Sequence, residues 1–153
     1  VTLDDRLVEA IKIDHRTAPV SAYVPAVEVG GLLHISGQLP FRDGAVVTGR
    51  LGADMDEASG YDAARRCALM LVAQIGKAVG GDWSRVEKIV KLGVFISSTP
   101  DFTAQPKVAN GASELMESLF GDVGRHARSA VGVAVLPLGA AVEVDAIVAV
   151  RPA

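Results

Sequence analysis

Charged side chains interrupt an otherwise apolar, strand-like segment in residues 124–150. An alternating pattern begins at Arg128, turns at Leu-Pro-Leu-Gly and returns with Glu143 and Asp145 among valines. A guanidinium presents a planar fork that matches a carboxylate, and a carboxylate can position water for attack on a carbon–nitrogen double bond. These residue types therefore suit a site for a small acid, although the same pattern is typical of a surface arginine and a solvated strand face.

Strand alternation predicts which residues surround Arg128. Because alternate residues of a strand share a face, Arg128 lies on the same side as the very small residues Ala130, Gly132 and Ala134. On the returning strand the two acidic residues alternate with valines. The small side chains after Arg128 leave space over the sheet that a helix, a second subunit or a ligand must fill.

The spacing of apolar residues predicts the elements that hold these side chains. We expect a short helix at about residues 3–12, a long helix at 56–79 and a third helix ended by Gly121. Asp101 or Thr103 is expected to cap that third helix, with Pro106 in its first turn. The expected strands are 26–29, 32–36, 45–48, 89–97, 127–135 and 140–150.

This order, β-β-(β)-α-β-α-β-β, predicts an α+β fold in a single domain spanning residues 1–153. One mixed sheet is expected, with two helices on one face. The other face is rich in Val, Ala and Gly and needs cover, which favours assembly with further copies of the chain.

Composition narrows the classes of function. The net charge of −3 opposes binding to a phosphate backbone, so a nucleic-acid partner is not expected. A single cysteine, Cys67, excludes an intramolecular disulfide and a multi-cysteine metal site, and it is expected to be a small buried residue. No apolar run approaches the roughly 20 residues of a membrane span, which predicts a soluble, cytoplasmic protein.

Other residues with potential chemistry fit weaker hypotheses. The three histidines His15, His34 and His126 do not stand at ligand spacing, so no metal site is expected. His126 has the same strand parity as Arg128 and either borders the same cleft or lies on the surface. Ser36 lacks a nucleophile-elbow sequence, which favours a pocket-lining hydroxyl.

Three blocks of the sequence together resemble a known family. They are RSAVGVAVLPLGAAVEVDAIV, AYVPAVEVGGLLHISGQLP and KIVKLGVFISSTPDF. They are similar to the C-terminal signature, the Ser-Gly-Gln-Leu-Pro block and the central strand of the RidA/YjgF/YER057c/UK114 family. The resemblance covers about residues 18–150.

This resemblance implies a chorismate-mutase-like fold, assembled as a homotrimer with clefts between subunits. It further implies hydrolysis of reactive enamines and imines, released by pyridoxal-phosphate enzymes, to 2-oxo acids and ammonia without a cofactor. By position, Arg128 would hold the substrate carboxylate and Glu143 would position water. Tyr23 and Ser36 would line the pocket, and the main-chain N–H of Ala130 would bond the substrate.

Two departures from the family pattern keep alternatives open. Ala130 stands where well-studied deaminases have Cys, and Pro106 stands where they have Asn. These differences favour a second hypothesis, a non-catalytic trimer that binds small carboxylates or regulates a partner. A ribonuclease, a label that this family sometimes carries, is a third, against which the acidic charge argues.

Overall fold

The computed structural model describes residues 22–153, so the expected helix at 3–12 and His15 lie outside the described residues. Five strands form the main sheet: β1 (Ala26–Val29), β2 (Leu32–Gln38), β5 (Val86–Ser97), β6 (Ala127–Val133) and β7 (Val142–Val150). Their order is β1-β2-β7-β5-β6. The β5–β6 pair is parallel and the other pairs are antiparallel, so the expected mixed sheet is confirmed.

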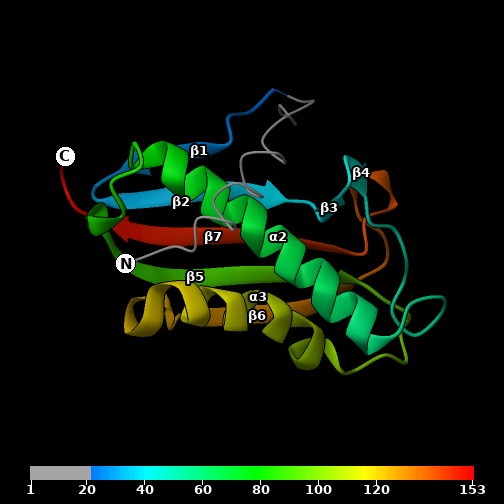
Figure 1. Ribbon diagram of the computed structural model, residues 1–153. Helices are drawn as coiled ribbons and strands as arrows, with labels where there is room; N and C mark the ends of the chain where they lie inside the picture. Colours follow the sequence, from blue (N-terminus) through cyan, green and yellow to red (C-terminus); the bar gives the residue numbers. More distant parts are fainter. Residues whose placement is uncertain (1–21) are drawn as a thin grey trace.

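Two helices, α2 (Glu57–Ala78) and α3 (Gln105–Phe120), cover one face of this sheet (Figure 1). β3 (Phe41–Arg42) and β4 (Ala45–Val46) pair with each other in a separate two-stranded hairpin. Within residues 22–153 there are also three short 3₁₀ turns: η1 (Trp83–Arg85), η2 (Gly121–Gly124) and η3 (Pro137–Gly139). The predicted α+β layer arrangement is therefore the observed one.

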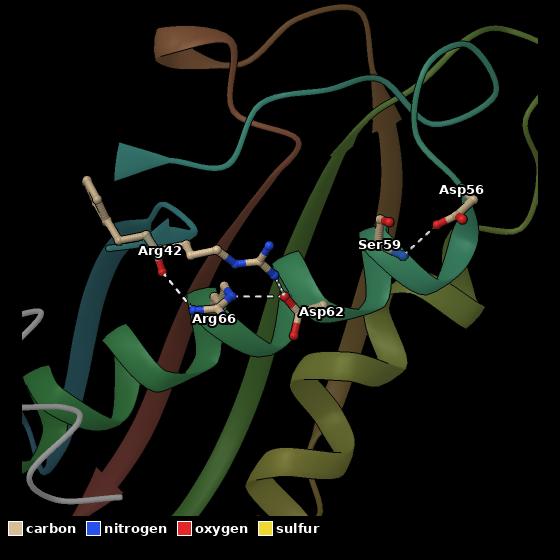
Figure 2. Close-up of polar contacts among 6 residues, drawn as sticks. Arg42, Asp56, Ser59, Asp62 and Arg66 are labelled. Carbon is tan, nitrogen blue, oxygen red and sulfur yellow. Dashed lines mark hydrogen bonds and ion pairs between the residues drawn. The ribbon is translucent and has the colours of Figure 1, made fainter. Parts of the chain in front are cut away.

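The start of α2 is fixed by local polar contacts. The Asp56 carboxylate accepts a hydrogen bond from the backbone N–H of Ser59 at 2.8 Å, which caps the first turn (Figure 2). One turn further, Asp62 accepts from Arg66 at 2.9 Å and from Arg42 at 2.6 Å. These ion pairs tie the β3–β4 hairpin to the outer surface of the helix.

The start of α3 differs from the prediction that Asp101 or Thr103 caps it. Ala104 occupies the cap position and no side chain accepts a hydrogen bond from the first turn. Pro106 lies in that turn, as expected, and because proline has no N–H it reduces the number of donors that need a cap. Gly121 ends the helix with φ of 60°, a conformation that suits glycine.

The core lies between the two helices and the covered face of the sheet. Alternate residues of β7, from Val142 to Val150, are buried there. The helices approach closely because small residues line their crossing: a Cβ added at Gly111 would collide with the backbone carbonyl of Tyr61. Cys67 is buried in this core, as expected. No helix in residues 22–153 is both long and apolar enough to cross a membrane.

Candidate active site

The strand register places Arg128 and Glu143 on opposite faces of the sheet. Arg128 is aligned with Leu92, a fully buried residue of the covered face. Glu143 is aligned with Phe95. The neighbours of Phe95 along β5, Val94 and Ile96, are buried on the covered side, so Phe95 and Glu143 lie on the open side. Within one copy of the chain, the two residues that the sequence pairs functionally therefore do not meet.

Arg128 lies beneath α3, and two neutral side chains of that helix hold its guanidinium by hydrogen bonds. Its Nη1 donates to Asn110 Oδ1 at 2.9 Å and to Ser113 Oγ at 3.1 Å. Both hydrogens of Nη1 are thus engaged. Within residues 22–153, no carboxylate forms an ion pair with Arg128, so its remaining N–H groups can bind an anion bidentately.

Asn110 is a site residue that the sequence comparison missed. The resemblance pointed to an asparagine at the position of Pro106, but Asn110 lies four residues later, about one helical turn along α3. There its amide oxygen contacts Arg128 directly. The spacing of Asn110 and Ser113, three residues apart on one helix face, is the signal that would have identified them.

The main-chain N–H of Ala130 points toward the free edge of β6. The carbonyl of Val133 points toward β5, where it accepts a hydrogen bond from the N–H of Ser98 at 3.1 Å. The carbonyl of the next residue, Ala134, points the other way and accepts from Arg50 at 2.5 Å. Because these directions alternate along a strand, residues 128, 130 and 132 direct their backbone groups away from β5. β6 is the last strand of the sheet, so this N–H can reach a ligand beside Arg128.

A recess of about 190 Å³ opens beside Arg128 at the end of α3. Its lining consists of Ser113, Glu117, Gly124, Arg125, His126 and Arg128. His126 and Arg128 thus border one cavity, as their shared parity predicts. Burial lowers the pKa of His126, and the nearby Arg128 and Lys88 lower it further, against the opposing effects of the Ala127 carbonyl and Glu117.

Glu143 lies on the open face, beside the end of β2 that contains Ser36 and Gly37. Tyr23 precedes β1, is 52% exposed and lines neither the recess beside Arg128 nor the hollow on the open face. The Oε1 atom of Glu143 is 2.5 Å from the position that a Cβ at residue 37 would occupy, so the Glu143 side chain packs directly over Gly37 and would have to shift if residue 37 carried a side chain. Ser36 Oγ donates to the carbonyl of Val24 at 2.8 Å, which holds the chain after Tyr23 against β2. Burial raises the pKa of Glu143, and the neighbouring Asp145 raises it further.

A second, larger hollow of about 510 Å³ lies on the open face, and Asp145, but not Glu143, is part of its lining. Its polar lining includes Ser36, Ser129, His34, Lys91 and Asp145, and Phe95 and Ile147 contribute apolar walls. Burial raises the pKa of Asp145, while the N–H of Gly93 and the ammonium of Lys91 partly oppose that rise. Among the described residues, no three His, Cys, Asp or Glu side chains lie close enough to hold a metal ion.

Comparison with known proteins identifies the family. The family model described as "YjgF/chorismate mutase-like, putative endoribonuclease" matches residues 4–149. The protein belongs to the YjgF/chorismate mutase-like family. The family resemblance noted in the sequence is thereby confirmed, and so is the chorismate-mutase-like α+β fold.

Three relatives show how this member of the YjgF family compares with others. Protein TCP17 of Trypanosoma cruzi is 56% identical over 140 residues, which cover 90% of this chain and 87% of that protein. The crystal structure of Atu1372 from Agrobacterium tumefaciens, described as of unknown function, has 44% identity and a TM-score of 0.86, and the match covers 97% and 95% of the two chains. The 2-iminobutanoate/2-iminopropanoate deaminase of Dermatophagoides farinae is 29% identical over 135 residues, 87% of this chain and 89% of that protein.

Proposed function

We propose that this protein hydrolyses reactive imines and enamines of 2-oxo acids, of the 2-aminoacrylate type, to the oxo acid and ammonia. The observation that carries the proposal is the Arg128 guanidinium, held by neutral partners and open to an anion. The similarity to an enzyme named 2-iminobutanoate/2-iminopropanoate deaminase supports this reaction class. An imine carbon is already electrophilic, so oriented substrate and water suffice without a cofactor.

The reaction divides between two groups of residues. Arg128 binds the substrate carboxylate, and the Ala130 N–H at the strand edge adds a second hydrogen bond. Glu143 takes a proton from a water molecule while the water oxygen bonds to the imine carbon. The π electron pair of the C=N bond moves to nitrogen in the same step. Glu143 returns this proton to the nitrogen, which gives a carbinolamine with one OH and one NH2 group. Glu143 then takes the hydroxyl proton and passes it to the NH2 group as the C–N bond breaks, so that ammonia leaves and the carbonyl forms. The raised pKa of Glu143 favours this acid–base role near neutral pH.

Because Arg128 and Glu143 lie on opposite faces of one sheet, we propose that a site contains Arg128 from one copy and Glu143 from the next in a homotrimer. Exposed apolar side chains on the open face of the sheet support such assembly. Val27 is 50%, Val29 is 63% and Val131 is 43% exposed, and the edge strand β6 lacks a second neighbour within the described chain.

Loss of Arg128 tests the reaction directly. The imine of a small neutral amino acid is generated in situ by an amino-acid oxidase, and its hydrolysis is followed with wild type, Arg128→Ala and the control Arg42→Ala. We expect kcat/KM to fall about 100-fold for Arg128→Ala, since a charge-assisted pair to the substrate is lost, and to stay unchanged for the control. Equal rates for wild type and Arg128→Ala would exclude the proposed role.

A non-catalytic carboxylate-binding trimer is the second candidate function, favoured by Ala130 in place of a thiol. It predicts a distinct result in the same assay. Wild type would then give no hydrolysis above background, while the product 2-oxobutyrate would still raise Tm in an Arg128-dependent way.

A further inference from the structure

The recess beside Arg128 contains more positive charge than a monocarboxylate requires. We propose that the preferred substrate carries a second acid group, so that it is the imine of an acidic amino acid, a 2-imino dicarboxylate. This inference rests on the proposed function, since it assumes that Arg128 binds the first carboxylate. Arg125 then binds the distal carboxylate.

Arg125 and Arg128 line the same recess, next to the Ser113 hydroxyl and the His126 ring. The one carboxylate in that lining is Glu117, and its Oε1 lies 4.0 Å from Arg125 Nε, at the outer limit of an ion pair. The side chains of both residues are well exposed, at 69% and 61%, so this contact stabilises the pair little and a bound anion can replace it. Arg125 is therefore available to a ligand already held by Arg128.

The size of the recess agrees with a short acidic arm. At about 190 Å³ it is smaller than the 300–1,000 Å³ or so of sites for drug-sized ligands, a size that suits a short arm better than a nucleotide or a long side chain. The ring of His126 is held in place by the contact of its Nδ1 with the Ala127 carbonyl at 3.0 Å. The lining of the recess is thus mostly polar, and one of its side chains is held by a backbone contact, which suits a carboxylate better than an apolar side chain.

Binding of product-like acids tests this proposal. Calorimetry with the full chain compares 2-oxoglutarate with 2-oxobutyrate, for wild type, Arg125→Gln, Glu117→Gln and the exposed control Arg65→Gln. We expect wild type to bind 2-oxoglutarate about tenfold more tightly, and Arg125→Gln to weaken that binding about threefold to tenfold while leaving 2-oxobutyrate unchanged. Glu117→Gln should strengthen 2-oxoglutarate binding, because it removes a competing carboxylate.

The outcomes separate this inference from the proposed function. Two results would overturn this inference: equal affinity for the two acids, or a preference for 2-oxoglutarate that survives Arg125→Gln. The proposed function would still stand in either case if Arg128→Ala abolishes binding of 2-oxobutyrate. Failure of both acids to bind wild type, together with equal rates of imine hydrolysis by wild type and Arg128→Ala, would overturn the proposed function as well. A parallel turnover assay, with imines generated from aspartate and from alanine, should show the same preference in kcat/KM.

Discussion

The two faces of the main sheet differ in how completely the chain covers them with its own side chains and helices. On the helix-covered side of β7, Val142 and Val144 are fully buried in a core of small, tightly packed residues. On the other side of the same strand, Glu143 and Asp145 are half-buried carboxylates, Asp145 borders a hollow, and apolar residues nearby are exposed. The covered face thus stabilises the fold of one chain, whereas the open face and the β6 edge carry the groups suited to chemistry and assembly.

Overfilling the covered face should have the largest effect on stability. In Gly111→Val the new Cβ meets the backbone carbonyl of Tyr61, which cannot move aside without separating α2 from α3. We expect the free energy of unfolding to fall by about 3 kcal/mol or more, measured by urea denaturation.

Ser118→Val is the matched control, because Ser118 is an exposed residue of the same helix. It introduces the same side chain with a change of about 0.5 kcal/mol or less. If the two variants were equally stable, close packing at the helix crossing would not be what stabilises the covered face.

A charge on the open face should act on assembly rather than on the fold. Val131 is 43% exposed on that face, and in Val131→Asp a carboxylate would be buried between copies. We expect the variant to elute as a folded monomer in size-exclusion chromatography with light scattering, whereas wild type has about three times the mass of the chain. Ser118→Asp, on the helix layer, should keep the wild-type mass, and retention of that mass by Val131→Asp would argue against an interface here.

Glu143 on the open face and Asp62 on the outer surface of α2 should make stability respond to pH with opposite signs, as a smaller effect. Burial raises the pKa of Glu143, so the folded chain holds this proton more tightly and its stability falls as pH rises above the ordinary carboxyl pKa. Burial also acts to raise the pKa of Asp62, but the hydrogen bonds and charges of Arg66 and Arg42 outweigh burial and lower it. The contribution of Asp62 to the free energy of unfolding is therefore present at neutral pH and is lost as pH falls through the lowered pKa.

We therefore expect Glu143→Gln to raise and Asp62→Asn to lower the free energy of unfolding at pH 7, each by about 1 kcal/mol or less. Both differences from wild type should shrink toward zero well below pH 4. Urea denaturation at several pH values measures them, and differences of the same sign at pH 7 would contradict the assigned environments.

Much of the fold follows from local sequence patterns. The helix predicted at 56–79 is α2 at Glu57–Ala78, because long apolar periodicity with a capping Asp56 and a Gly80-Gly81 stop leaves little ambiguity. The predicted strand at 45–48 is shorter and pairs outside the main sheet, as β4 of a separate hairpin. Its pairing, like the missing side-chain cap of α3, depends on neighbours that the local sequence does not specify.

The candidate site was predictable to the extent that strand parity determines it. Parity places His126 and Arg128 at one recess and Glu143 beside Asp145 on one face. It does not identify Asn110, because that contact depends on where α3 lies over β6. Nor does it show that Arg128 and Glu143 face opposite ways, since this follows from how β6 and β7 are each aligned with β5.

The most direct test of the shared site is complementation between two inactive variants. Arg128→Ala and Glu143→Gln are each purified alone, and both chains are also co-expressed in equal amounts to form mixed trimers. If a site takes Arg128 from one copy and Glu143 from the next, about a quarter of the sites in the mixture are intact, and imine hydrolysis should return to about a quarter of the wild-type rate. A mixture no more active than the separate variants would contradict a site shared between copies.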